Sequence, residues 1–176
     1  ISLSIFFIIY YLLYAEVLYD YIFISYSVYL VGFLDDLRIN IKPLRRLLIM
    51  VLLLFIIIYT LPIKISNIDI PFLKSFMNNH LFSSIFVLLC FLFVINGANL
   101  IDGFNGLLTI NLIIINVILT YININSDNLE FSILLISQII ILLSFLLFNF
   151  PTAKIFLGDS GAYTMGALTG LNTIIT

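Results

Sequence analysis

Three short segments carry most of the side chains that could do chemistry in an otherwise apolar sequence. Asp35 and Asp36 are adjacent, Asn96–Leu107 reads Asn-Gly-Ala-Asn-Leu-Ile-Asp-Gly-Phe-Asn-Gly-Leu, and Phe156–Gly161 reads Phe-Leu-Gly-Asp-Ser-Gly. Mg²⁺ binds proteins through one or two carboxylates together with the phosphates of a substrate. If the three segments meet in space, they predict a Mg²⁺ site for a phosphate substrate, with Mn²⁺ as the alternative ion.

Glycines and basic residues flank these acids. The glycines stand where a backbone would need a positive φ or a close approach to a ligand: Gly103, Gly106, Gly158 and Gly161. Backbone N–H groups at the helix starts expected after Gly106 and Gly161 would favour an anion. Three basic residues could add positive charge for phosphates: Arg38, Lys42 and Lys154.

Each segment also has an ordinary structural interpretation. An Asp-Asp-x-Arg loop can be a solvated turn at a membrane edge. Asn96, Asn99 and Asp102 lie near one face of a helix and could hydrogen-bond a neighbouring helix. Asp159 or Ser160 could cap a helix. A binding or catalytic site is favoured because, by the topology derived below, all three segments lie on the same side of a membrane.

Composition indicates a membrane protein. The chain is 63% hydrophobic and 9% charged, with a mean hydropathy of +1.26, whereas soluble domains are about 45–50% apolar and ~25% charged. A spanning helix needs about 20 mostly apolar residues. We therefore predict an all-α, polytopic transmembrane helix bundle and no nucleic-acid partner. About seven apolar stretches are long enough, or nearly so: Ile1–Ala15, Val17–Leu34, Leu47–Ile63, Leu81–Ile101, Gly103–Ser126, Phe131–Ala153 and Ser160–Thr176.

A single integral-membrane domain over residues 1–176 is expected, because no repeat or soluble boundary interrupts the pattern. Both ends fall inside apolar runs, so we expect a fragment that is incomplete at both ends. The connection Pro62–His80 alternates isoleucines between prolines and suggests a short hairpin or surface strand. His80 is expected at the membrane interface, and Cys90 is expected to pack.

The basic residues predict the topology. Four of the seven crowd one connection: Arg38, Lys42, Arg45 and Arg46. The positive-inside rule makes that connection cytoplasmic. Counting spans forward places Pro62–His80 outside, and it places Asn99–Gly106 and Asn149–Gly161 inside. The three acidic segments would then share the cytoplasmic face, as expected if they pair or line one polar cavity.

At these segments the sequence resembles the polyprenyl-phosphate N-acetylhexosamine-1-phosphate transferases, glycosyltransferase family 4. The three motifs occur in the family's order and at suitable distances over essentially the whole chain. The resemblance implies Mg²⁺-dependent transfer of N-acetylhexosamine-1-phosphate from a UDP-sugar to polyprenyl (undecaprenyl) phosphate, with release of UMP. It also implies a bacterial inner-membrane enzyme with a cytoplasmic active site, with room for a homodimer. The Phe-Leu-Gly-Asp-Ser-Gly-Ala-Tyr stretch resembles members that start lipopolysaccharide or other cell-surface glycans.

The resemblance also implies roles for individual residues. Asp35 and Asp36 are the catalytic candidates, Asp102 lines the site, and Asp159 is the metal ligand. Because two neighbouring carboxylates cannot both ionise freely, one pKa should rise, and the resemblance favours Asp35 as the base. The substrate-binding candidates are Asn99 near the metal and pyrophosphate, Asn105 near the nucleotide, Asn149 and Phe156 at the nucleoside, and Lys154.

Two points stay open from the sequence. Many bacterial members of the family have Asp where this chain has Asn105, which leaves nucleotide contacts or sugar choice undecided. An aspartyl-phosphate intermediate is also compatible with the motifs. The rival functions are a cation-coupled transporter, which predicts acids at the bilayer centre and inverted repeats, and a helical membrane subunit without chemistry.

Overall fold

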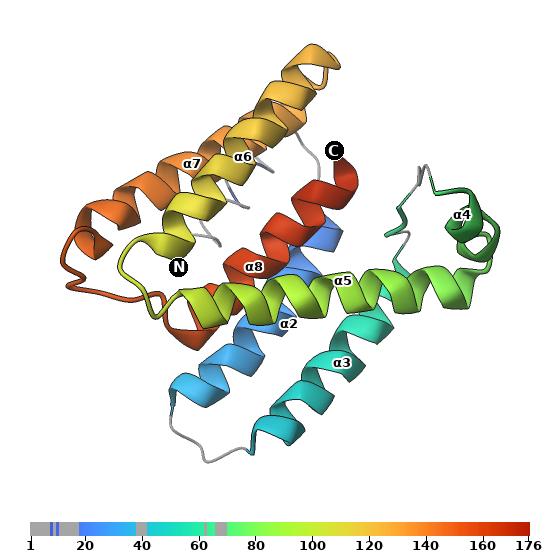
Figure 1. The fold of residues 1–176 in the computed structure, drawn as a ribbon, viewed down its shortest axis with the longest axis horizontal. Helices are drawn as coiled ribbons and strands as arrows, with labels where there is room; N and C mark the ends of the chain where they lie inside the picture. The colour runs from blue at the N-terminus through green and yellow to red at the C-terminus, as the bar shows by residue number, and fades with distance from the viewer. Residues whose placement is uncertain (1–7, 9, 11–17, 38–41, 62, 66–69) are drawn as a thin grey trace.

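A computed structural model describes residues 8, 10, 18–37, 42–61, 63–65 and 70–176 of the 176-residue chain. The part that it describes contains helices and no strands, which confirms the all-α prediction (Figure 1). The first predicted span, Ile1–Ala15, lies outside the described residues except at positions 8 and 10. The helices are α2 (Tyr19–Asp36), α3 (Pro43–Thr60), α4 (Pro71–Met77), α5 (His80–Ile101), α6 (Leu107–Asn125), α7 (Leu129–Asn149) and α8 (Gly158–Ile175).

Helix α8 forms the axis of the bundle. Helices α2 and α5 pack along it, and α6 also contacts it (Figure 1). Every residue from Ala162 to Asn172 is buried. A Cβ added at Gly166 would lie 2.9 Å from the Ala98 Cβ of α5. Small residues therefore let these helices approach closely, which is the usual way that membrane helices associate.

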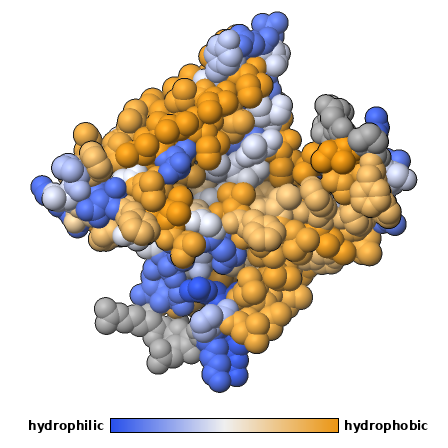
Figure 2. Space-filling view, in the orientation of Figure 1, coloured by the Kyte–Doolittle hydropathy of each residue, from blue (hydrophilic) through white to orange (hydrophobic). Residues whose placement is uncertain are grey.

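In the part of the chain that the structure describes, four helices are long and apolar enough to cross a membrane: α3, α5, α6 and α7. Their outer surfaces are apolar, whereas hydrophilic residues gather where helix ends meet (Figure 2). Helices α2 and α8 have 18 residues each but are less apolar. Helix α2 carries aspartates at both ends, and α8 is rich in Gly and Thr because the other helices enclose it.

Helices α3 and α8 begin before the positions that the sequence predicts, with consequences for the site residues. Helix α3 begins at Pro43 rather than Leu47, since proline is favoured in the first turn of a helix. Its first turn therefore includes Arg45 and Arg46. Helix α8 begins at Gly158 rather than after Gly161. Both starts bring additional polar residues into helical geometry at the same end of the bundle.

The predicted hairpin in Pro62–His80 is wrong in its described part. Residues 63–65 form no strand, residues 62 and 66–69 lie outside the described residues, and the connection ends in the short helix α4. Asn79 is the N-cap residue of α5. Its side-chain oxygen accepts hydrogen bonds from the N–H groups of Leu81 and Phe82 at 3.0 and 3.3 Å. The His80 ring packs edge-on against Tyr59, with 4.6 Å between ring centroids.

A buried polar network joins four helices inside the bundle. Tyr21 of α2 donates to Asn172 Oδ1 of α8 at 2.7 Å. Asn172 Nδ2 donates to Gln138 of α7 at 2.7 Å and to Asn116 of α6 at 3.1 Å. All four residues are at most 3% exposed. In apolar surroundings such bonds have no competing water, so the network fixes how three helices are set around α8.

We expect Asn172→Leu to destabilise the protein by about 1–3 kcal/mol, because three buried polar groups lose their partner. Thermal unfolding in detergent measures the change. The control is Asn111→Leu, since the exposed Asn111 donates to the Leu107 carbonyl of its own helix, and this variant should melt near the parent temperature. Equal melting temperatures for the two variants would show that the network does not hold the bundle together.

Candidate functional site

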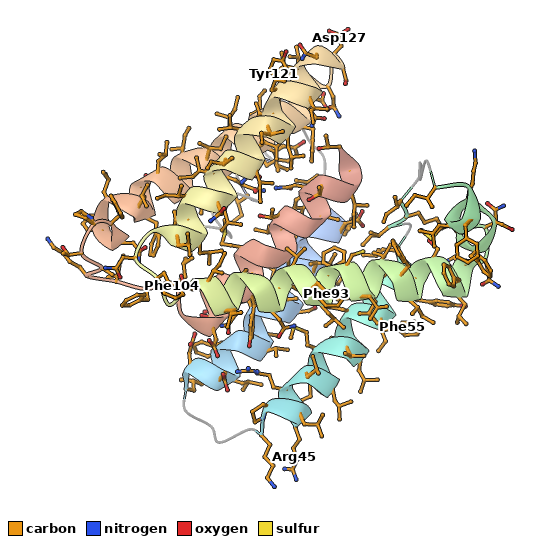
Figure 3. The ribbon with its side chains drawn as sticks, viewed as in Figure 1. Arg45, Phe55, Phe93, Phe104, Tyr121 and Asp127 are labelled. Atoms are coloured by element: carbon orange, nitrogen blue, oxygen red, sulfur yellow. The ribbon has the colours of Figure 1, made fainter. Side chains whose placement is uncertain are left out.

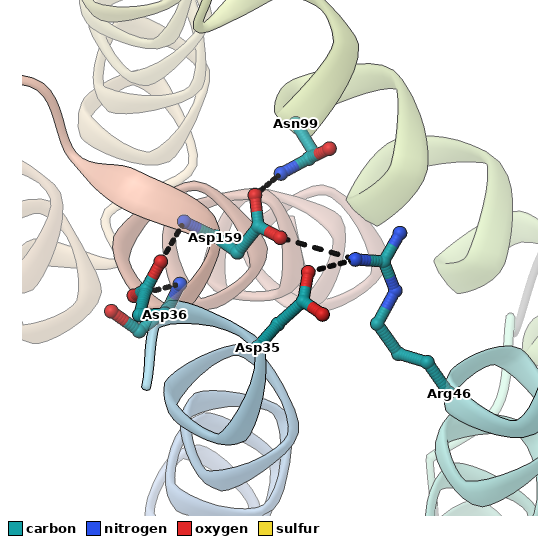
Figure 4. A network of polar contacts seen from close by, with 6 residues as sticks. Asp35, Asp36, Arg46, Asn99 and Asp159 are labelled. Atoms are coloured by element: carbon teal, nitrogen blue, oxygen red, sulfur yellow. Dashed lines mark hydrogen bonds and ion pairs between the residues drawn. The ribbon is translucent and has the colours of Figure 1, made fainter. Parts of the chain in front are cut away.

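Four helix ends meet around the carboxylate of Asp159, in the first turn of α8 (Figure 4). Asp159 Oδ1 accepts a hydrogen bond from Asn99 Nδ2 of α5 at 2.5 Å. Asp159 Oδ2 lies 3.1 Å from Arg46 Nη1 of α3. The same guanidinium nitrogen pairs with Asp35 Oδ2 of α2. Residues that are far apart in the sequence thus form one polar cluster at one end of the bundle.

Arg46 is the residue of this cluster that sequence reasoning missed. In the sequence it is one of the four basic residues that predict the topology. Its side chain is 23% exposed, and its guanidinium lies 5.5 Å from the centre of the buried Tyr163 ring, in cation–π range. The neighbouring Arg45 is exposed and projects away from the bundle at the end of α3 (Figure 3). Pro43 could have indicated the role of Arg46, because proline favours a helix start at position 43 and so places Arg46 in the first turn of α3.

The adjacent carboxylates Asp35 and Asp36 point to different partners. Asp35 pairs with Arg46, whereas Asp36 Oδ1 and Oδ2 accept the backbone N–H groups of Asp159 and Ser160 at 3.0 and 3.1 Å (Figure 4). The acid that shares a charged partner with Asp35 is therefore Asp159, not Asp36. Burial raises the pKa of Asp159, and the Asp35 carboxyl adds to the rise, whereas Asn99 and Arg46 oppose it.

Asp102 approaches the same helix start from α5. It follows the last residue of that helix and is 9% exposed. Burial raises the pKa of Asp102, while the backbone N–H groups of Gly158 and Leu157 oppose the rise. The nearby Asp159 carboxylate raises it further. The structure thus brings all four predicted acids, Asp35, Asp36, Asp102 and Asp159, to the beginning of α8.

The start of α8 does not offer the free anion site that was expected after Gly161. The helix begins earlier, and Asp36 already accepts the N–H groups of Asp159 and Ser160. The alternative interpretation, in which the side chain of Asp159 or Ser160 caps the helix, is also wrong, since neither side chain caps it. Among the glycines expected to need a positive φ, Gly106 and Gly158 have φ values of 73° and 70°.

The remaining predicted residues lie in or next to the two connections that lead from α5 to α6 and from α7 to α8. Asn149 is 2% exposed, and it accepts the Gly106 N–H at 2.6 Å and donates to the Ile155 carbonyl at 2.7 Å. Asn105 donates to the Pro151 carbonyl at 3.1 Å. These two amides join the turn before α6 to the segment before α8. The side chains of Phe156 and Lys154 are exposed.

The other polar candidates take no part in the cluster among the described residues. Asn96 is exposed and donates to the Leu92 carbonyl of its own helix, so it does not join helices as the structural interpretation suggested. Lys42 is exposed at the start of α3. Arg38 lies outside the described residues.

The donor chemistry of the cluster fits Mg²⁺. The carboxylates of Asp35 and Asp159 already share one cation, the guanidinium of Arg46. Among the described residues, no group of three or more His, Cys, Asp or Glu side chains is arranged to hold a metal. Mg²⁺ does not require such a group, because it commonly binds one or two carboxylates together with substrate phosphates and water.

Comparison with known proteins gives consistent matches. The family model described as glycosyl transferase family 4 matches residues 18–176. Phospho-N-acetylmuramoyl-pentapeptide-transferase of Clostridium perfringens (strain 13 / Type A) is 32% identical over 153 residues, which are 82% of this chain and 48% of that protein. The protein of the same name from Leuconostoc mesenteroides is 36% identical over 141 residues, 80% of this chain and 43% of that protein. The chain spans about half the length of the curated relatives it matches.

We expect Asp102→Asn to raise the melting temperature at neutral pH. Because the pKa of Asp102 is raised above 3.8, the folded state holds the proton more tightly than the unfolded state. The parent therefore loses stability as the pH rises through the folded pKa, and the uncharged amide avoids that loss. The advantage should shrink as the pH falls towards about 4, where the unfolded carboxyl is itself protonated.

Thermal unfolding across this pH range measures the effect, with the exposed Asp127→Asn in the turn after α6 as the control (Figure 3). The control should leave the pH profile unchanged. A stability difference between parent and Asp102→Asn that does not vary with pH would contradict the assignment.

Proposed function

Because the chain belongs to glycosyl transferase family 4, we propose that it is part of a membrane enzyme that moves a sugar-1-phosphate from a UDP-sugar onto polyprenyl phosphate. The observation that carries this proposal is the convergence of Asp35, Arg46, Asn99 and Asp159 from four helices at one end of an apolar bundle. Such a cluster combines anionic groups for a divalent cation with a guanidinium for phosphate. Both are needed where two phosphate-bearing substrates react.

Asp35 and Arg46 have the chemistry for the transfer step. Asp35 would accept a proton from the lipid phosphate, whose oxygen then attacks the β-phosphorus of the UDP-sugar. The bond between that phosphorus and the bridging oxygen breaks, and UMP leaves. The planar Arg46 guanidinium has several N–H donors, so it can bind phosphate oxygens as well as carboxylates. Most of the catalysis would come from positioning and charge neutralisation.

Asp159 and Asn99 are the residues that we expect to hold Mg²⁺ with the pyrophosphate. Bound there, the ion would supply positive charge to the pyrophosphate oxygens. Asn99 already orients the Asp159 carboxylate through their 2.5 Å hydrogen bond. Asp102 would line the site on the α5 side.

The nucleoside side of the site is proposed to lie along the segment before α8. Phe156 is 55% exposed, so its ring is available to stack on uracil. Asn149 and Asn105 hold the backbone of the two neighbouring turns, and Lys154 would contribute positive charge nearby. We therefore assign the two amides to shaping the nucleotide pocket.

The lipid substrate would approach from the membrane beside α5. Phe93 and Leu100 of that helix are each 78% exposed. Leu100 directly follows Asn99, which is the α5 residue of the cluster. A polyprenyl chain could pack on this apolar surface while its phosphate reaches Arg46. The positive-inside bias supports a cytoplasmic site, and the family resemblance suggests a bacterial plasma membrane. A homodimer stays a prediction.

The positions of the acids support a transferase over a cation-coupled transporter. Asp35 and Asp36 end α2, Asp102 follows α5, and Asp159 lies in the first turn of α8. All four therefore stand at helix ends. A transporter would be expected to carry such acids near the bilayer centre.

The donor sugar remains the open part of this proposal. The relatives described above are named as transferases of phospho-N-acetylmuramoyl-pentapeptide. The Phe-Leu-Gly-Asp-Ser-Gly-Ala-Tyr stretch instead resembles the same stretch in enzymes that start lipopolysaccharide or other surface glycans. Both groups fit a UDP-linked N-acetylhexosamine. We propose that class of donor.

The full-length protein should release UMP from a UDP-N-acetylhexosamine when polyprenyl phosphate and Mg²⁺ are present. Incubation with labelled UDP-N-acetylglucosamine and, in parallel, UDP-N-acetylmuramoyl-pentapeptide tests the reaction and separates the two donors. Chromatography of the nucleotide product gives the readout. Release of UDP instead would mean simple glycosyl transfer and would reject the proposed chemistry.

We expect Asp159→Asn to lower turnover on the order of 100-fold or more, because it removes a charge that stabilises the transition state. The amide keeps the volume and avoids the cost of ionising a carboxyl whose pKa is raised by burial, so the melting temperature should stay at or above that of the parent. Raised Mg²⁺ should restore part of the activity. Steady-state rates over a Mg²⁺ series measure the effect. Asp20→Asn, at the opposite end of α2, is the control and should behave like the parent. Near-parental turnover with unchanged Mg²⁺ dependence would refute the ligand assignment.

A further inference from the structure

The start of α8 is capped by a side chain from a different helix. The first N–H groups of a helix lack partners within the helix and need other acceptors. No side chain of the α8 start supplies one, since the residue at the cap position is Leu157. Asp36 of α2 supplies two acceptors, because Oδ1 and Oδ2 accept the N–H groups of Asp159 and Ser160 at 3.0 and 3.1 Å.

Two glycines make this contact between α2 and α8 sterically feasible. A Cβ added at Gly32 of α2 would lie 2.5 Å from the Ser160 Cα and 2.6 Å from its backbone nitrogen. A Cβ added at Gly158 would lie 3.1 Å from Asp36 Oδ1, and Gly158 also has a positive φ of 70°. The backbones of α2 and α8 are therefore in direct contact one turn from the carboxylate. The position of Asp36 relative to the α8 start is closely determined.

The cap acts on the residue that carries the candidate metal-binding carboxylate. Asp36 binds the backbone of Asp159, and the Asp159 side chain projects to the other side, towards Asn99 and Arg46 (Figure 4). The negative charge of Asp36 is also stabilised by the positive end of the α8 dipole. Both oxygens of Asp36 are thus directed to the helix, while those of Asp159 are directed to the cluster.

We propose that Asp36 is a positioning residue, which fixes the start of α8 and thereby orients Asp159 towards Arg46 and Asn99. This proposal rests on the function proposed for the same cluster. It gives the two adjacent aspartates different tasks. Asp35 faces the reacting groups, whereas Asp36 acts through the backbone of α8 and does not touch the transferred phosphate.

Capping chemistry gives the proposal a specific test in the full-length protein. Asn keeps one acceptor oxygen at the same distance from the backbone of α2 as Asp, whereas Ala has none. We therefore expect Asp36→Asn to keep much of the turnover, and Asp36→Ala to lose on the order of 10–100-fold, as expected when a catalytic group is misplaced. The Mg²⁺ concentration for half-maximal activity should rise in the Ala variant and stay near the parent value in the Asn variant.

A second readout does not depend on turnover. Ligands that bind the folded state raise the melting temperature, so Mg²⁺ with UMP should stabilise the parent and the Asn variant, and stabilise Asp36→Ala less. If the parent releases no UMP in any assay, the proposed function fails, and this ligand-induced shift still decides whether Asp36 orients the site. If Asp36→Ala does not fold, the Asn variant decides the question.

The matched control is Asn79→Ala, which removes a cap that also accepts two backbone N–H groups, at the far end of α5. Its melting temperature should fall, but turnover per folded molecule should stay at the parent value. Two outcomes would overturn the proposal. Equal inactivity of the Asn and Ala variants, with parental stability for Asn, would show that Asp36 acts directly on the substrates. Parental turnover in a folded Asp36→Ala would show that the cap is structural alone.

Discussion

The site depends on one guanidinium placed between two carboxylates. Charged groups at the edge of an apolar bundle are stable where they are paired, and Arg46 pairs with Asp35 and Asp159 at once. This interaction links α2, α3 and α8, and the hydrogen bond from Asn99 adds α5. The four helices must therefore keep their ends in register. The cation–π contact with Tyr163 supports the guanidinium from the α8 side.

The ends of the four helices can stay aligned because α8 packs closely against its neighbours. Its residues suit contact with other helices better than contact with lipid. Its eleven consecutive buried positions, Ala162–Asn172, are rich in small and polar residues. Gly166 allows α5 to approach closely, and Asn172 forms hydrogen bonds with side chains of three other helices. A hydropathy scale measures how well a helix suits lipid, so it ranks the enclosed α8 below the four outer helices. For that reason the most central helix is not among the helices that are apolar enough to cross a membrane, although the sequence predicted a span at Ser160–Thr176.

The sequence was sufficient to predict what local patterns determine. Apolar stretches predicted an all-helical membrane protein, and short motifs indicated the acids that the structure brings together. Partner choice was not predictable, because neighbouring residues on a helix point about 100° apart. Asp35 and Asp36 were expected to interact with each other, but this rotation sends one to Arg46 and the other to the α8 backbone. Arg46 was missed because the predicted helix start at Leu47 excluded it from the helix.

The charges of the cluster suit the function proposed above, in which a divalent cation and phosphate groups would bind together. With both carboxylates ionised, Asp35, Asp159 and Arg46 together carry one net negative charge, and the charge of Asp36 is directed to the α8 dipole. A cluster with this balance attracts a divalent cation better than it attracts a phosphate. A bound divalent cation would make the balance positive and would favour an anionic ligand. As phosphate oxygens compete for the Arg46 guanidinium, Asp35 would be released from its pairing and become available to accept a proton. The resting ion pair is therefore compatible with a site that becomes active when both ligands have bound.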